Sequence, residues 1–195
     1  MIPNGVLLLR DEYTPLVSPE SLKKTGLFDY ELGGVQLGDV SEGHSRYTWK
    51  LTVESGTKLT LTREGIEPIL VHTLSSKPID VAFCFDQSMN PVLAWLTTDF
   101  EIFLRKFNFS THVYEDISYG LGKCPRLTLD EKRKEFIPKS DIIFAYIQYN
   151  KLMYRVQREG FNVAHIVESD MLPSQRLARI GVNNFRLQMV LTPKG

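Results

Sequence analysis

The sequence predicts a mainly β protein: an antiparallel β-sandwich, or paired three-stranded β-meanders, with short helical turns and an irregular N-terminal region. Polar and apolar residues alternate over much of the chain after Tyr47, which is the period of a strand with one buried face. Short runs rich in Gly, Asn, Ser and Pro separate these stretches and are typical of turns between strands. The 195 residues, 43% of them hydrophobic, are enough to build a packed core.

Residues 1–46 are the least regular part of the chain, and we expect them to form an arm or loop region. Ser18 as the N-cap and Pro19 at the first helical position predict a short helix that Gly26 ends. The Gly-rich run over residues 31–45 predicts a loop that contains one short strand. The first residues lack the basic start, long apolar stretch and cleavage site of a signal peptide, so we expect the chain to fold in a cytoplasm.

Residues 47–195 form the predicted β domain, which begins with a hairpin region over residues 47–78. The stretches "YTWKLTVE" and "TKLTLTRE" alternate on either side of Ser55-Gly56, which is a turn signal. The next stretch, "EPILVHTL" (residues 67–74), is more continuously apolar. There we expect a strand covered on both faces, with Pro68 at its beginning.

Two related β-meander units are predicted over residues 79–118 and 140–168. "DVAFCFDQSMNPVLAW" begins the first and "DIIFAYIQYNKLMYRV" the second, and each predicts a strand, a turn and a strand. At an offset of 61 residues the following pairs coincide: Asp80 and Asp141, Phe83 and Phe144, Phe85 and Tyr146, Gln87 and Gln148, and Phe100 and Phe161. The second strand slips by about one residue, with Leu93-Ala94-Trp95 set against Leu152-Met153-Tyr154. Both a true duplication and the general likeness of β-meanders fit this pattern.

Within the first unit, Val81, Phe83 and Phe85 share one face of a strand, and we expect them to point into a core. Cys84 lies on the opposite, smaller face and is typical of a buried small hydrophobe. A disulfide between Cys84 and Cys124 is not expected in a product that folds in a cytoplasm.

The connections and the closing segment carry turn and helix signals. We expect Asp86 and Gln87 to cap the turn after the first strand. Residues 120–140 break the β pattern, and Thr128 followed by Glu131 resembles a capping box that predicts a helical turn.

In the closing segment, residues 169–195, a turn or short helix is predicted from Ser174 to Ile180, with Gly181 as its end. The stretch "FRLQMVL" (residues 185–191) then alternates and predicts a closing strand.

The chain carries no GxSxG, P-loop, HExxH or CxxC motif, and its four histidines are not at metal-ligand spacing. We therefore expect no enzyme, and no catalytic, cofactor-binding or metal-binding residues. No apolar run approaches the ~18 residues that a membrane span needs. The equal numbers of basic and acidic residues, 23 of each, argue against nucleic acid as a partner.

Arginine, glutamine and aromatic residues gather in "YRVQREGF" and "SQRLARIGVNNFRLQ", a composition typical of contacts between proteins. The candidate subunit-contact residues are Trp95, Tyr154, Arg155, Arg158 and Arg176. The alternative is a glycan- or host-surface-binding module, for which Trp49, Trp95 and Tyr119 would supply aromatic faces.

Four stretches together carry a family resemblance over roughly residues 80–190: "IDVAFCFDQSMNPVLAW", "GKCPRLTLDEKR", "SDIIFAYIQYNKLMYRVQREGF" and "IGVNNFRLQ". They resemble small bacteriophage virion proteins encoded among the tail and head-completion genes of double-stranded DNA phages. That family has an Asp-Gln turn, a Leu-Asp-Asp-Lys-Arg-like loop, a Ser-Asp strand and a Gln-Arg-Asp-Arg-Phe-like end. The corresponding residues here are Asp86-Gln87, Leu129–Arg133, Ser140-Asp141 and Gln157–Phe161. Glu131, Gly160 and the less aromatic stretch "EIFLRKF" depart from the family pattern.

The resemblance implies a non-catalytic structural component of a virion, assembled in the host cytoplasm and present in several symmetry-related copies. We expect it in the tail or at the head–tail junction, as a homo-oligomeric ring or attachment collar. Its expected partners are copies of itself and other virion proteins, and the free strand edges of a β-rich chain are natural sites for such pairing. The glycan-binding alternative would place the module in a tail-fibre apparatus.

Overall fold

The structure, a computed structural model, describes residues 35–36, 49–63, 65–86, 90–129, 141–183 and 186–193. Over these residues the chain is mainly β, its strand pairs are antiparallel, and a 3₁₀ turn spans Gln157–Glu159. The predicted fold class is therefore confirmed. A short strand lies in the Gly-rich run where one was expected, at Val35–Gln36. The helix predicted from Ser18 and the capping residue Gln87 lie outside the described residues.

The described strands form four sheets, each a meander in which strands that follow one another along the chain are paired. Sheet 1 contains β1 (Val35–Gln36), β2 (Trp49–Glu54), β3 (Lys58–Arg63) and β4 (Ile66–Thr73). Sheet 2 contains β5 (Asp80–Phe85), β6 (Pro91–Leu96), β7 (Glu101–Asn108) and β8 (Val113–Leu121). Sheet 3 contains β9 (Lys123–Leu129), β10 (Ile142–Gln148), β11 (Lys151–Val156) and β12 (His165–Glu168). Sheet 4 contains β13 (Gln175–Asn183) and β14 (Arg186–Pro193).

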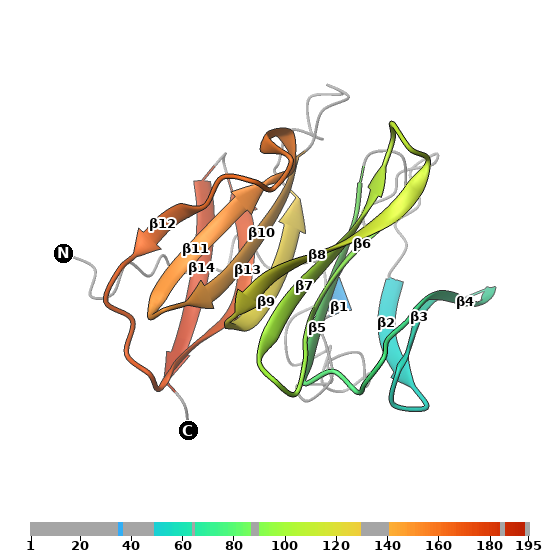
Figure 1. The fold of residues 1–195 in the computed structure, drawn as a ribbon, viewed down its shortest axis with the longest axis horizontal. Coiled ribbons are helices and arrows are strands. Elements are labelled where there is room, and N and C mark those ends of the chain that lie inside the picture. Colours follow the sequence, from blue (N-terminus) through green and yellow to red (C-terminus); the bar gives the residue numbers. More distant parts are fainter. Residues whose placement is uncertain are drawn as a thin grey trace.

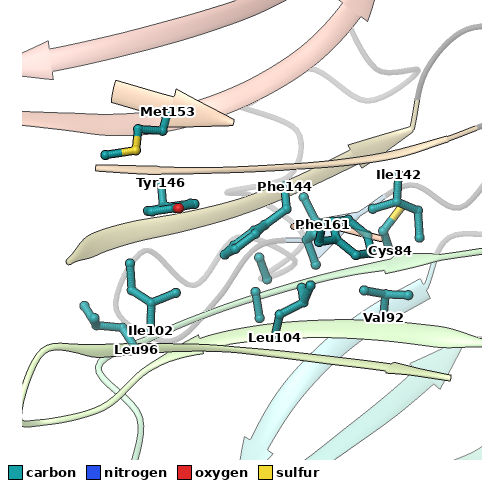
Figure 2. Packing of buried hydrophobic residues seen from close by; sticks show 13 residues of the cluster. Cys84, Val92, Leu96, Ile102, Leu104, Ile142, Phe144, Tyr146, Met153 and Phe161 are labelled. Atoms are coloured by element: carbon teal, nitrogen blue, oxygen red, sulfur yellow. The ribbon is translucent and has the colours of Figure 1, made fainter. Parts of the chain in front are cut away.

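The four sheets are stacked in chain order, with a hydrophobic core between each pair of neighbours. Sheet 2 lies between sheets 1 and 3 (Figure 1). Between sheets 1 and 2 lie Trp49, Leu51, Leu59, Leu61, Val81, Phe83, Phe85, Leu93 and Trp95. Between sheets 2 and 3 lie residues such as Cys84, Leu104, Phe144, Tyr146 and Phe161 (Figure 2). Between sheets 3 and 4 lie Cys124, Ala145, Ile147, Leu152, Leu177 and Met189.

This stacking covers strands β5 and β10 of the two middle sheets on both faces, which explains their sequences. All residues of β10 are buried, as are those of β5 after Asp80. A strand covered on both faces needs apolar residues at every position, so it loses the polar and apolar alternation of a surface strand. The face predicted for Val81, Phe83 and Phe85 is confirmed, and Cys84 is buried on the opposite face and is not in a disulfide.

The two predicted units occupy sheets 2 and 3 and face the same way along the stack. Phe83 of β5 points toward sheet 1, and its counterpart Phe144 of β10 points toward sheet 2. On the opposite faces, Cys84 packs toward sheet 3, and its counterpart Ala145 packs toward sheet 4. Equivalent faces therefore point in one direction, and the units are stacked head to tail.

A rare backbone conformation recurs at the same place in both units. Phe100, just before β7, has a φ of 62°, and Phe161, after β11, has a φ of 63°. Only a few per cent of residues other than glycine adopt this left-handed region. Because the two residues also coincide at the offset of 61, their shared conformation favours duplication over a general likeness between β-meanders.

Strand pairing corrects the alignment of the second strands. Phe83 lies opposite Leu93, and Phe144 lies opposite Arg155. Leu93 therefore corresponds to Arg155 and not to Leu152. The observed slip from the offset of 61 is one residue, because Leu93 and Arg155 are 62 residues apart. The match of Leu93 with Leu152, which are 59 residues apart, was wrong, because similarity of residue type does not define cross-strand partners.

The strand predicted over residues 67–74 forms as β4, but the prediction that both its faces are covered is wrong. Ile66 to Leu70 are exposed, and Val71 and His72 are half-buried. β4 is an edge strand of sheet 1, and sheet 1 is an end layer of the described stack. Pro68, which has no N–H to donate, suits such an edge position.

One predicted helical segment is a strand, and most of the other lies outside the described residues. Thr128, read as a helix cap, lies in β9 opposite Ile143, and Glu131 lies outside the described residues. Most of the turn or helix predicted from Ser174 to Ile180 belongs to β13, in which Leu177 enters the core and pairs across to β14. In this second segment, strand pairing and burial outweigh the local helix signals. The predicted closing strand is confirmed as β14.

Candidate functional site

Arg155, a predicted subunit-contact residue, joins sheets 2 and 3. Its Nε donates to the Tyr146 hydroxyl at 2.8 Å, and its Nη1 donates to the carbonyl oxygens of Phe161 at 3.0 Å and Asn162 at 2.6 Å. The guanidinium also lies over the ring of Tyr119, 4.7 Å from the ring centroid. These contacts saturate much of the guanidinium's donor fork, so Arg155 primarily stabilises the fold.

Tyr119 of β8 also lies between the two sheets. Together with Arg155, Tyr146 and the Phe161 carbonyl it forms a hydrogen-bonded group that we call the polar seam. Its hydroxyl donates to the Phe161 carbonyl at 3.2 Å, and its own carbonyl accepts from Gln148 Nε2 at 2.7 Å. Burial raises the pKa of Tyr119 to about 12, although the nearby Arg155 guanidinium acts in the opposite direction. The phenol is therefore held in its neutral, donating form over the whole physiological range.

Arg126 of β9 is a second connecting residue, which the sequence did not single out. Its Nε donates to the Ala178 carbonyl of sheet 4 at 2.9 Å, and its Nη1 lies 2.7 Å from Asp80 Oδ2 of sheet 2. One side chain of sheet 3 thus contacts both neighbouring layers. No local pattern distinguishes it from a solvated arginine on a strand.

Tyr154 lies on β11 of sheet 3, and Arg158 lies in the 3₁₀ turn that follows this strand. Tyr154 is half-buried and stacks on His165, with ring centroids 4.9 Å apart, and His165 Nε2 lies 2.7 Å from Glu159 Oε2. Arg158 pairs with Asp141 at 3.4 Å, and 60% of its side chain remains exposed. Of these two candidates, Arg158 offers the larger surface to a partner.

Trp95 is a core residue, so its assignment as a surface contact is corrected. Only 6% of it is exposed, and its ring stacks on Phe103 at 5.3 Å. Trp49 is also buried, and Tyr119 is covered by Arg155. The aromatic faces proposed for glycan binding are therefore engaged inside the fold.

The five candidate contact residues do not form one site. Trp95 lies between sheets 1 and 2, while Tyr154, Arg155 and Arg158 follow one another in sheet 3 and its 3₁₀ turn. Arg176 is exposed on β13 of sheet 4. Arg158 and Arg176 are the exposed members of the set.

The turn chemistry predicted at Asp86 is confirmed. Asp86 is buried, its Oδ1 accepts from the Asn90 backbone N–H at 2.8 Å, and its Oδ2 accepts from Asn90 Nδ2 at 3.1 Å. Its carboxylate therefore closes the β5–β6 turn.

The β7–β8 hairpin tip, defined as residues 107–114, is an aromatic surface that was not predicted from the sequence. Phe107 packs against Phe109 and Tyr114, with ring centroids 5.2 and 5.3 Å away. Phe109 and Val113 remain 53% and 54% exposed. The turn is fixed by Asn108 Oδ1, which accepts from the backbone N–H groups of the two residues that follow Phe109. The sequence feature that indicates this surface is the density of aromatic residues around an Asn-x-Ser-Thr turn in "KFNFSTHVY".

Within the part of the chain that the structure describes, no three His, Cys, Asp or Glu side chains are grouped closely enough to hold a metal ion. The same residues contain no helix with the length and hydrophobicity needed to cross a membrane. No protein-family model, curated protein or solved structure matches the chain.

Proposed function

We propose that this chain is a non-catalytic structural component of a bacteriophage virion, placed in the tail or at the head–tail junction and assembled as a homo-oligomeric ring or collar. The observation that supports the proposal is that polar side chains join the sheets inside the chain while apolar side chains remain exposed at one tip. Arg126, Arg155 and Tyr119 hold neighbouring sheets together, whereas apolar side chains such as Phe109 and Val113 remain exposed at the hairpin tip.

Exposed apolar groups of this kind favour contact with another protein. Large apolar side chains in one exposed patch commonly mark an interaction surface. Ile69 and Leu70 are also exposed, on the edge strand β4. Edge strands and aromatic tips are surfaces that repeated subunits can share. The assignment to a phage particle rests on the resemblance over residues 80–190.

The test is the mass of the protein in solution and its presence in particles. Light scattering should give a multiple of the 22.4 kDa chain, and mass spectrometry should detect the chain in purified virions. A chain that stays monomeric at high concentration and is absent from virions would overturn the proposal.

Paired variants locate the contact. Phe109→Ser combined with Val113→Ser should lower the oligomer mass, because both side chains are exposed at the hairpin tip. The matched control is Tyr149→Asn, which removes an exposed aromatic ring from a turn of sheet 3 where asparagine tolerates the positive φ. Equal loss of assembly in both variants would contradict a contact at the tip, and circular dichroism would verify that both remain folded.

A further inference from the structure

His72 connects sheet 1 to sheet 2 through contacts with two strands of sheet 2. It projects from β4, and its ring centroid lies 5.3 Å from that of Trp95 on β6. Its Nε2 lies 3.6 Å from Asp116 Oδ2 on β8, and its side chain is 17% exposed. The imidazole therefore occupies a partly desolvated position between the layers.

The carboxylate that faces His72 already has a stronger partner. Arg105 Nη1 on β7 lies 2.7 Å from Asp116 Oδ1. The Nε of Arg105 is buried and has no hydrogen-bond acceptor among the described residues. A protonated His72 would place a second cation beside this guanidinium, and the two would share one carboxylate.

We propose that His72 is a pH-sensitive contact between sheets 1 and 2, which holds the sheets together while the imidazole is neutral and loosens them when it is protonated. Among the described residues, the charged groups that face it from sheet 2 are Arg105 and Asp116, with Tyr114 beneath the Arg105 guanidinium. From sheet 1, its cross-strand neighbour is the uncharged Leu59.

The electrostatic balance agrees with this geometry. Burial first, and then the charge of Arg105, lower the pKa of His72 below its ordinary value of 6.5, and Asp116 opposes them. The folded chain therefore binds fewer protons than the unfolded chain just below pH 6.5. Stability is fully present above that pH and is lost as the pH falls through the folded-state pKa.

Both tryptophans of the chain lie in the core between sheets 1 and 2, so they report on this interface. On acidification from pH 7.5 to 5, the wild-type emission maximum should shift to the red, and acrylamide quenching should increase. His72→Gln should show neither change. The matched control His112→Asn, in the exposed hairpin and of a residue type that tolerates the positive φ there, should behave like the wild type. An acid transition that persists in a folded His72→Gln protein would overturn the proposal.

Two further variants give opposite shifts and do not require His72 to be replaced. Asp116→Asn removes the anion that favours protonated His72, so the midpoint should move to lower pH. Arg105→Gln removes the repelling cation, so the midpoint should move to higher pH. If neither midpoint moves, or if both move in the same direction, His72 is not the group that responds to pH.

Discussion

Phe100 and Phe161 offer a matched pair of glycine substitutions, because they share a left-handed φ of 62° and 63° at equivalent places in two units. Their side chains differ in burial: Phe100 is 58% exposed, whereas Phe161 is completely buried between sheets 2 and 3. Replacing either residue by glycine should change the backbone contribution to the free energy of unfolding by nearly the same amount. The difference between the two variants therefore measures the burial of one phenyl ring.

The expected changes in the free energy of unfolding follow from three contributions: relief of backbone strain, loss of conformational entropy and loss of the buried ring. Glycine relieves about 1–2 kcal/mol of left-handed strain and costs about 0.5–1 kcal/mol in conformational entropy. Loss of a buried phenylalanine side chain costs about 3–5 kcal/mol. Phe161→Gly should thus lower the free energy of unfolding by about 2–4 kcal/mol. Phe100→Gly should stay within about 1 kcal/mol of the wild type, since its ring buries less than half of its surface.

Urea unfolding monitored by circular dichroism measures both values, provided that the transitions fit a two-state model. The Phe161 carbonyl, which accepts from Tyr119 and Arg155, remains in the glycine variant, so the polar seam is unchanged in composition. Equal destabilisation by the two substitutions would refute the difference in burial and the stacking of sheet 3 on sheet 2.

Two further predictions concern the polar seam. In a double-mutant cycle, Arg155→Leu and Tyr146→Phe should each lower the free energy of unfolding, because each change leaves the other residue without its hydrogen bond. The double variant should lose about 0.5–3 kcal/mol less than the sum of the two single losses. Additive losses in urea unfolding would contradict this coupling. Stability should also fall as the pH rises from about 10 toward about 12, because the raised pKa of Tyr119 makes the folded chain retain a proton that the unfolded chain releases. Tyr119→Phe should remove this part of the alkaline loss, and an unchanged profile would show that the phenol does not contribute.

The sequence predicted the β class and the meanders because alternation and turn residues are local signals. The alternation in "YTWKLTVE" became β2, with Trp49 and Leu51 buried, and Asp86 closes the turn where it was expected. The same logic fails at β4, where an apolar run predicts a strand covered on both faces but forms an exposed edge strand. Burial on both faces depends on the number of layers, which no short stretch of sequence encodes.

The candidate contact residues were predicted less well, for a related reason. Residue type indicates that a tryptophan or an arginine is able to form a contact, but only the fold decides whether the partner lies inside the chain. Trp95 meets His72 and Phe103, and Arg155 meets the Phe161 carbonyl. The exposed hairpin tip was overlooked because its aromatic residues fit a strand pattern as well as a surface.

The two units place different residues at the equivalent interface positions, and the second unit places Arg155 there. The offset and the strand pairing place Tyr146 and Arg155 in sheet 3 where sheet 2 has Phe85 and Leu93. Between sheets 1 and 2 the latter pair is buried and apolar, whereas between sheets 2 and 3 the former pair is joined by a hydrogen bond of 2.8 Å. A lone arginine in that layer would be costly, because a buried charge needs partners for its remaining donors. Phe161 supplies one of the acceptors, since its carbonyl receives hydrogen bonds from both Arg155 and Tyr119, and Asn162 supplies another. The left-handed turn shared by the two units is therefore also part of what makes the arginine tolerable in the second interface.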